Sequence, residues 1–356
     1  MKAQYALFGI LMTSVAHSAD FGIYANSVSA HNIAAAQHEI ANRFLRPLGG
    51  AVASSVVTHA EKTAAPADAS MSHVAQNPDA YGEMLYYGEF GDDTGVLPLV
   101  TGHSGGDTGD EYFRVGGHHF SDNVKFKSNP RLESTSDLVF AAYGKEFNAT
   151  RIEFFGGYAG GHTENSGVDI KTNGAFIGAS YGKKIDEIEL TVMADFGIAA
   201  NDVDTTLYDD DFSNFYAGIF GNVAYDYVYD GVLTLHPAFR AGYTFVNSAN
   251  YMLTGGESIA NRDYGFFELT PIFDIIGNIG DGFSIGGHLA YVLNFATGGK
   301  TMVDYVAIPK LKTDNYFEYG ISLGQNFDRF SLNINLGRHE GARNGWNGGA
   351  EFKYAF

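Results

Sequence analysis

Apolar and polar residues alternate with a period of two through most of the chain after residue 111. The segments 188–198, 283–295 and 330–336 carry bulky apolar residues on one parity, and mostly small, polar or charged residues on the other. A period of two is typical of an extended strand, whose successive side chains point to opposite faces. The pattern therefore predicts strands with one apolar and one polar face.

Twelve such strands are expected, and the links between them alternate between short and long. The expected strands span residues 111–121, 136–146, 149–161, 172–183, 186–200, 213–228, 231–246, 263–277, 281–297, 314–327, 329–339 and 344–356. The short links are 148–149, 185–187, 229–231, 280–282 and 327–329, and the long ones include 201–214 and 247–263. Pro237 and Pro271 fall inside expected strands, where a missing N–H predicts a local bulge.

Two architectures use such strands in opposite ways. In a soluble sandwich the apolar face makes the core, whereas in a transmembrane barrel it meets lipid and the polar face lines the lumen. Sandwich strands are usually about 5–6 residues long, but several of these runs continue for ten residues or more. Their length, their even number and the alternation of tight turns with long loops favour an all-β, 12-stranded antiparallel transmembrane β-barrel.

The last strand supports the barrel. Its apolar face carries four aromatic residues, Trp346, Phe352, Tyr354 and Phe356. Trp346 and Phe356 are ten residues apart, which is roughly 24 Å along the membrane normal at a strand tilt near 45° and close to the ~25 Å apolar band of such barrels. We expect this face to contact outer-membrane lipids, and we expect Phe356 to lie at the periplasmic rim.

The N-terminus predicts a targeting segment. Residues 1–18 contain a basic Lys2, a short apolar run at 5–12 and small residues before the expected cut between Ser18 and Ala19. This order of features is that of a cleavable signal peptide. The apolar run is too short for a transmembrane anchor, which needs about 20 apolar residues.

The segment 19–110 contains the one convincing helix, at residues 27–46, with Ser27 or Ser29 able to cap its start. Twenty helical residues rise about 30 Å, one membrane thickness. Two locations stay open: a helix threaded through the barrel lumen, or a short periplasmic helix. The candidate pore-helix residues are Ile33, Ala36, Ile40 and Arg43. Residues 47–80 are expected to be a linker, and 81–110 to be irregular.

Composition excludes several functions. The chain has 41 acidic and 22 basic residues, a formal charge of −19, and no Cys. Nucleic acid is therefore not an expected partner, because its phosphates need the opposite charge. The absence of Cys excludes disulfides, thiolate metal sites and a cysteine nucleophile.

The sequence contains no recognisable catalytic or metal site. His118 and His119 are neighbours on an expected strand, so they point to opposite faces and cannot both bind one ion. The acidic segments 105–111 and 208–212 do not match an EF-hand loop, and the chain has no G-x-S-x-G, H-E-x-x-H or P-loop motif. We expect no enzyme activity, no cofactor and no bound metal.

Residues 111–356 resemble the autotransporter β-domain, the translocator of type V secretion. The resemblance is carried by EYFRVGG at 111–117, by the strand pairs from SDLVFAAYGKEF to VMADFG, by NFYAGIFGNVAYDYVYDGVLTLHPAFRAGYTFV, by DYGFFELTPIFDI and by the terminal NGGAEFKYAF. Many weakly specific positions, rather than one sharp motif, make up this similarity. The proline in LTLHPAFRAGY belongs to the same pattern.

The resemblance implies a barrel in the outer membrane of a Gram-negative-type bacterium, with a helix in its pore. The barrel assembly machinery and periplasmic chaperones would be its partners, and the machinery would read the terminal strand that carries Trp346, Phe352, Tyr354 and Phe356. The chain departs from the family before residue 111. Its segment 19–110 is too short for the usual β-helical passenger, and its helix is more than sixty residues from the first strand. It also contains no Asn-Asn pair, at which some members cut themselves.

Three functions stay as alternatives. The first is a translocator-type barrel that carries little or no passenger and anchors or displays a short N-terminal segment at the cell surface. The second is a stand-alone porin-like channel that this segment plugs or gates. The third is a surface adhesin that acts through its outer loops. In each case we expect a monomer.

Overall fold

The computed structural model describes residues 24–45, 110–126, 131–165, 168–205, 209–229, 232–252, 258–261, 263–299, 301–303, 306–308, 311, 314–327 and 329–356. The expected signal peptide, the linker at 47–80 and all but the last residue of 81–110 lie outside these ranges. The described elements are α2 (Ala25–Phe44), β1 (Asp110–Lys125), β2 (Arg131–Phe147), β3 (Thr150–Asn165), β4 (Val168–Ile185), β5 (Ile188–Thr205), β6 (Asp209–Tyr225), β7 (Tyr227–Tyr229), β8 (Leu233–Val246), β9 (Tyr251–Met252), β10 (Ser258–Asn261), β11 (Tyr264–Gly280), β12 (Phe283–Gly298), β13 (Thr301–Val303), β14 (Val306–Ile308), β15 (Tyr316–Phe327), β16 (Phe330–Gly341) and β17 (Arg343–Ala355).

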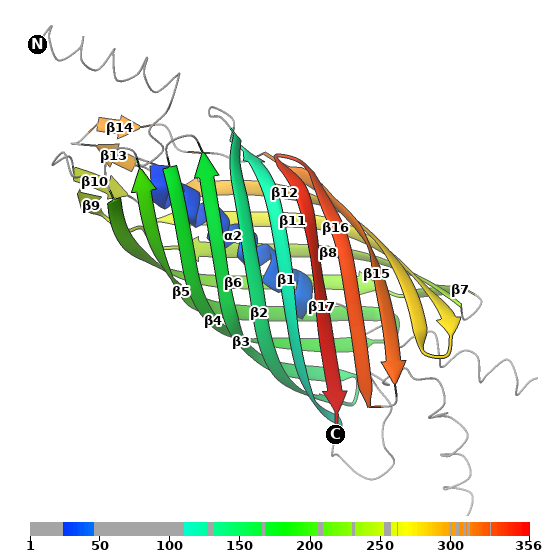
Figure 1. The fold of residues 1–356 in the computed structure, drawn as a ribbon. Coiled ribbons are helices and arrows are strands. Elements are labelled where there is room, and N and C mark those ends of the chain that lie inside the picture. Colours follow the sequence, from blue (N-terminus) through cyan, green and yellow to red (C-terminus); the bar gives the residue numbers. More distant parts are fainter. Residues whose placement is uncertain are drawn as a thin grey trace, which may run out of the picture.

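Twelve of the described strands form one closed antiparallel barrel (Figure 1). Neighbours around the barrel are also neighbours in the chain, apart from the short strands between them, and β1 pairs with both β2 and β17 to close it. A closed barrel pairs the edges of every strand, which is the condition for a sheet in contact with lipid. The predicted 12-stranded barrel is confirmed. The short strands β9, β10, β13 and β14 make a second sheet at one end.

Tight turns join the strands at the opposite end, which we call the short-turn end. The turns at 148–149, 186–187 and 281–282 connect consecutive barrel strands. Positive φ angles occur at Asn148 (46°), Ala149 (59°), Asp186 (53°), Asp281 (50°) and Gly282 (72°). Two-residue turns with positive φ match the twist of an antiparallel pair. The other two expected short links include residues 230, 231 and 328, which lie outside the described ranges. The end that carries the second sheet is the long-loop end.

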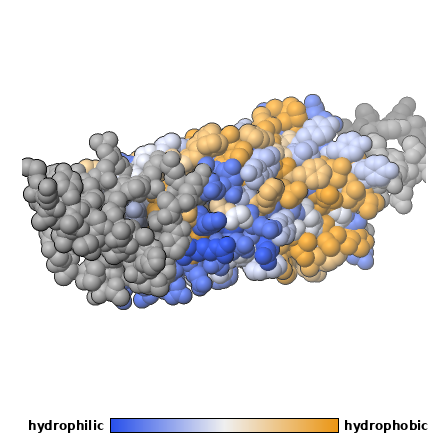
Figure 2. Space-filling view, turned by 90° about the horizontal axis from the view of Figure 1, so that it is seen from above, coloured by the Kyte–Doolittle hydropathy of each residue, from blue (hydrophilic) through white to orange (hydrophobic). Residues whose placement is uncertain are grey.

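The strands turn their apolar side chains outward. Along β2 exposed and buried positions alternate almost without interruption, and the exposed large residues of the barrel are mostly Phe, Tyr, Ile, Leu and Val. In Figure 2 hydrophobic residues gather over much of the barrel wall. Buried polar residues, including Arg114, Glu153 and Arg240, come from the inward parity. The barrel thus has apolar side chains outside and polar side chains inside, the reverse of a soluble sandwich. This is expected for a barrel whose outer face meets lipid.

The terminal strand β17 lies between β16 and β1. Trp346 and Phe356 are 54% and 55% exposed on its outer face, and Phe352 is exposed between them. The Tyr354 ring packs against Phe330 with 4.8 Å between the ring centroids and the two planes tilted by 33°. The strand ends at the short-turn end, where the backbone N–H of Phe356 donates to the carbonyl of Glu111 in β1.

The two prolines within strands do not produce the expected bulge. In the pairing of β11 with β8, Pro271 lies opposite Phe239 and Pro237 lies opposite Phe273, with no shift of register. Proline removes a ladder hydrogen bond only on the side to which its N–H would point. The missing hydrogen bond has only a local effect on the sheet. β6 stops pairing with β8 at Ala224, and β7 pairs with β8 in the same register from Tyr227 onward. The prediction of a bulge at the prolines was wrong.

Candidate functional site: the helix in the barrel lumen

The helix α2 lies inside the barrel, with its N-terminus at the long-loop end (Figure 1). The amide of Asn26 donates to the carbonyl of Ala249, which follows β8 at the long-loop end (2.7 Å). At the other terminus Arg151, next to the turn at 148–149, donates to the carbonyl of Phe44 (3.4 Å). The lumen location is therefore confirmed, and the alternative of a periplasmic helix was wrong. The described part of the chain has no helix that is both long and apolar enough to cross a membrane.

The helix begins and ends two residues earlier than predicted, and it is not capped by a serine. Its N-cap residue is Tyr24, which makes no side-chain capping bond. Ser29 lies one turn inside the helix, and its hydroxyl faces the amide oxygens of Asn201 (2.5 Å) and Asn214 (3.2 Å) in the wall. The expected cap was wrong because the barrel wall, rather than the helix N-terminus, provides the serine with its partners.

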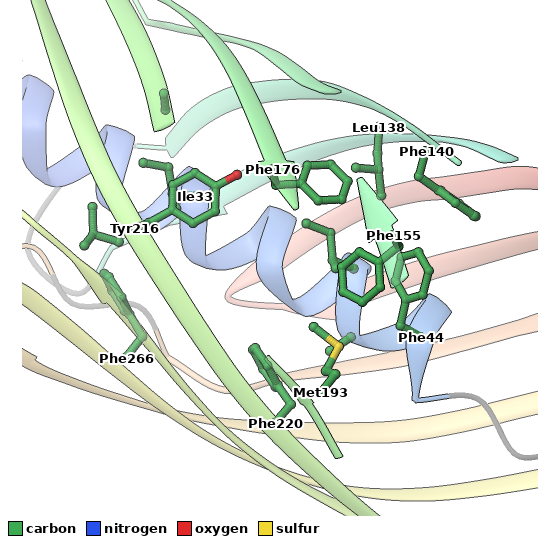
Figure 3. Packing of buried hydrophobic residues seen from close by; sticks show 14 of the residues in the cluster. Ile33, Phe44, Leu138, Phe140, Phe155, Phe176, Met193, Tyr216, Phe220 and Phe266 are labelled. Atoms are coloured by element: carbon green, nitrogen blue, oxygen red, sulfur yellow. The ribbon is translucent and has the colours of Figure 1, made fainter. Parts of the chain in front are cut away.

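An apolar contact holds the helix against one side of the wall (Figure 3). Ile33 and Phe44 point from the helix into a cluster of inward-facing residues on β2 to β6 and β11. The Phe44 ring stacks on Phe155 at 3.7 Å and meets Phe140 edge-on at 5.1 Å. In this region the wall is therefore apolar on its inner face, which packs against the helix, as well as on its outer face.

The helix approaches this side closely because the wall carries small residues there. Gln37 donates to the carboxylate of Asp195 (2.6 Å) beside Gly218 of β6. A Cβ atom at Gly218 would collide with the Gln37 amide oxygen and the Asp195 carboxylate. A Cβ here would have to displace the ends of these two side chains, so the close approach of the helix, rather than the backbone conformation, favours glycine.

Charged groups hold the C-terminal half of the helix to β8, β11 and β15. The Nδ1 atom of His38 lies 2.8 Å from Glu268 of β11, and its Nε2 atom lies 3.0 Å from Glu318 of β15. Arg240 of β8 lies 3.5 Å from the Glu268 carboxylate and also donates to Asn42 of the helix. These groups are buried. Burial of charges is tolerated when they are paired and hydrogen-bonded, as they are here.

A second cluster of polar and ionisable side chains surrounds Glu39 and Arg43 of the helix. Glu39 lies 3.1 Å from Nε2 of His118 and 3.6 Å from Nε2 of His339. Arg43 contacts Nδ1 of His118 and donates to Asn335 (2.8 Å). His118 thus faces the lumen, whereas His119 is exposed on the outer face beside Asp137, so the prediction that the two point to opposite faces is confirmed.

Arg114 connects the end of the helix to the wall at the short-turn end. Its guanidinium pairs with Glu153 (2.9 Å) and Glu351 (3.1 Å), and it donates to the backbone carbonyl of Arg43 (3.2 Å). It also lies over the ring of Phe44, 4.7 Å from the centroid. One side chain therefore pairs with two wall carboxylates and anchors the last turn of α2.

A cavity of about 230 Å³ lies beside the charged half of the helix, next to the wall on the β8 to β17 side. Its lining includes Glu39, Arg43, Arg240, His288 and Glu318. The lumen is therefore filled unevenly: the helix is tightly packed on the β2 to β6 side, and a polar space remains on the other.

All four candidate pore-helix residues lie in the lumen, but their environments differ. Ile33, Ile40 and Arg43 are buried against the wall, and Ala36 is half-buried beside small residues of β3 and β4. Sequence reasoning missed His38, Glu39 and their carboxylate and histidine partners. The available signal was the presence of ionisable residues at inward positions of strands, such as Glu268 and Glu318, together with charges within a helix of membrane length.

Comparison with solved structures identifies the fold. The β-domain of the Bordetella autotransporter BrkA aligns at TM-score 0.53 and 12% identity, covering 70% of this chain and 100% of that one. The transport unit of AIDA-I from Escherichia coli aligns at 0.53 and 14%, covering 74% and 95%. The translocator domain of NalP from Neisseria meningitidis aligns at 0.57 and 9%, covering 78% and 96%. No family model and no curated protein sequence matches the chain. The twelve-stranded barrel with a helix in its lumen has the fold of the autotransporter β-domain, as the sequence resemblance predicted.

Proposed function

We propose that the protein is an outer-membrane translocator-type barrel that anchors its own N-terminal helix in the lumen and displays the segment before that helix at the cell surface. The observation that carries the proposal is the direction of α2, because Asn26 contacts the long-loop end and Phe44 contacts the short-turn end. Outer-membrane barrels have short periplasmic turns and longer outer loops. Chain that precedes Tyr24 would then emerge outside, and with the expected cleavage after Ser18 it would be short.

The likeness in fold to autotransporter translocators supports this function. The exposed apolar outer face supports a location in the outer membrane, with lipid around a monomeric barrel. Insertion would use the barrel assembly machinery and periplasmic chaperones, which would recognise the terminal strand that ends at Phe356. The proposal assigns no catalytic chemistry to the barrel.

Cysteine labelling on intact cells tests the direction of the helix. The chain has no native Cys, so any label reports the introduced residue. Asp20→Cys should react with a membrane-impermeant maleimide, and Ala35→Cys, inside the lumen, should not. Labelling of Asp20→Cys only after the outer membrane is permeabilised would overturn the proposed display.

A plugged channel is the second candidate, and the polar cavity beside the helix favours it. If the helix acts as a plug, a barrel without residues 19–110 should conduct ions far better in planar bilayers than the intact protein. A conductance that is equal in the two proteins would exclude plugging. This result is independent of the labelling experiment, because a displayed segment and a plugged lumen are compatible.

A further inference from the structure

Three potential metal ligands meet in the lumen beside the cavity. The donor atoms of His38, Glu39 and Glu318 all lie within 4.8 Å of one another, and all three residues are buried. His38 and Glu39 come from the helix, and Glu318 comes from β15. Any ion bound here would bridge the helix and the wall.

The histidine is oriented as a metal ligand would be. Its Nδ1 atom faces both oxygens of Glu268, at 2.8 and 2.9 Å, so the Nδ1–H donates to that carboxylate. The Nε2 atom is hydrogen-bonded to Glu318, 3.0 Å away, so a metal ion held by both residues would replace the proton between them. A carboxylate behind a histidine is the usual arrangement at protein metal sites, since it fixes the ring and makes the other nitrogen a better donor.

Glu39 supplies a carboxylate oxygen without a hydrogen-bond partner. Its Oε2 atom lies 3.1 Å from His118, but its Oε1 atom is buried and accepts no hydrogen bond from the described residues. Nε2 of His339 lies 3.6 Å from Oε1. Two neighbouring buried carboxylates, Glu39 and Glu318, repel each other unless a proton or a cation lies between them.

A second histidine faces the other oxygen of Glu318. Nδ1 of His288, on β12, lies 2.6 Å from Asp274, and its Nε2 atom lies 3.8 Å from Oε1 of Glu318. His288 therefore repeats the carboxylate–histidine arrangement of His38, but it does not belong to the group of three donors. Donors on one tetrahedral ion, with bonds of about 2.0–2.1 Å, are about 3.3 Å apart. The 3.0 Å between Nε2 of His38 and Oε2 of Glu318 is close to this value.

We propose that His38, Glu39 and Glu318 bind one divalent transition-metal ion of the Zn²⁺ type. Mixed imidazole and carboxylate donors suit such an ion. The adjoining cavity of about 230 Å³ has room for a water ligand. The ion would join α2 to β15, and so fasten the helix in the lumen. The site follows from these residues and does not depend on the proposed function.

Zinc binding by the purified full-length barrel in detergent tests the proposal. The folded protein should bind one Zn²⁺ per chain in isothermal titration calorimetry. Glu318→Gln and His38→Gln should each weaken binding by about 10-fold or more. The matched control is His162→Gln, which removes an exposed histidine that also lies near two carboxylates, at 3.4 Å from Glu164 and 3.1 Å from Asp169. This control should bind like the unaltered protein.

Heat-modifiable migration on gels confirms that each variant is folded. If Glu318→Gln does not fold, Glu39→Gln replaces it, because Glu39 is in the same group of donors and lines the cavity, so its loss should still weaken Zn²⁺ binding. The proposal is overturned if the folded barrel binds no stoichiometric Zn²⁺, or if folded Glu318→Gln or Glu39→Gln binds as tightly as the unaltered protein. In that case His38 is an imidazolium ion shared by Glu268 and Glu318.

Discussion

The N-terminal half of α2, residues 25–34, and its C-terminal half, residues 35–44, contact the same barrel through different chemistry. In the first half Asn26 and Ser29 bond to neutral amides and carbonyls of the wall. In the second half His38, Glu39 and Arg43 meet carboxylates, histidines and amides. Both halves are buried, so the difference is in charge rather than in exposure.

The difference teaches where the helix is most strongly attached. A neutral hydrogen bond contributes about 0.5–1.5 kcal/mol net, because the unfolded chain forms equivalent bonds with water. Removing one partner of a buried ion pair costs about 3–5 kcal/mol, because it leaves an uncompensated charge. We therefore expect the C-terminal half to fix the helix in the lumen, and the N-terminal half to detach more easily.

The largest expected effect is at Arg114, the anchor of the charged half. Arg114→Met leaves the carboxylates of Glu153 and Glu351 without their cation, and should cost about 3–5 kcal/mol in the free energy of unfolding. Urea unfolding in lipid vesicles, followed by gel mobility, measures this loss. Adding Glu153→Gln and Glu351→Gln to the variant should restore much of it, since no charge is then left unpaired. A loss below about 1 kcal/mol in the single variant would contradict the role of charge in this half.

The barrel should tolerate a new charged side chain in the lumen but not on its outer face. Ile334 lies on the outer face of β16, and Asn333, one residue away, lines the cavity. Ile334→Arg should cost about 2–4 kcal/mol, as expected for a charge in contact with hydrocarbon. Asn333→Arg should cost much less, because its side chain enters a polar space, and Glu351 lies opposite it on β17. Equal losses in vesicle refolding would mean that the two faces are assigned incorrectly.

The sequence predicts the barrel better than it predicts the attachment of the helix. The strands are recognisable because lipid selects one long apolar parity in each of them, and this signal is local. The charged contacts are not local: His38 and Glu268 are 230 residues apart. Their meeting depends on the closure and register of the whole barrel, which no single segment encodes. The helix ends were misjudged for the same reason, because Ser29 bonds to the wall instead of capping the helix.

Close packing, the contact shared by both halves, should have an intermediate effect. Gly218→Ala introduces a methyl group between Gln37 and Asp195, and should cost about 1–3 kcal/mol through overpacking. Gly221→Ala, on the same strand, is the matched control, since its Cβ would meet only ordinary contacts at 3.9 Å. The urea midpoint of the control should stay within the error of the unaltered protein. If both variants lose the same stability, the helix does not pack against β6 as described.

The smallest effect is expected in the neutral half, at Ser29. Ser29→Ala removes contacts with Asn201 and Asn214, but these two amides remain bonded to each other (3.0 Å), and Asn201 also accepts from Thr172 (2.9 Å). The loss should therefore be about 1 kcal/mol, the net value of a hydrogen bond whose partners stay satisfied. Ser213→Ala, exposed on the outer face of β6, is the control and should change stability by less than about 0.5 kcal/mol. A loss at Ser29 that equals the loss in Arg114→Met would remove the contrast between the two halves, because neutral and charged contacts would then attach the helix equally.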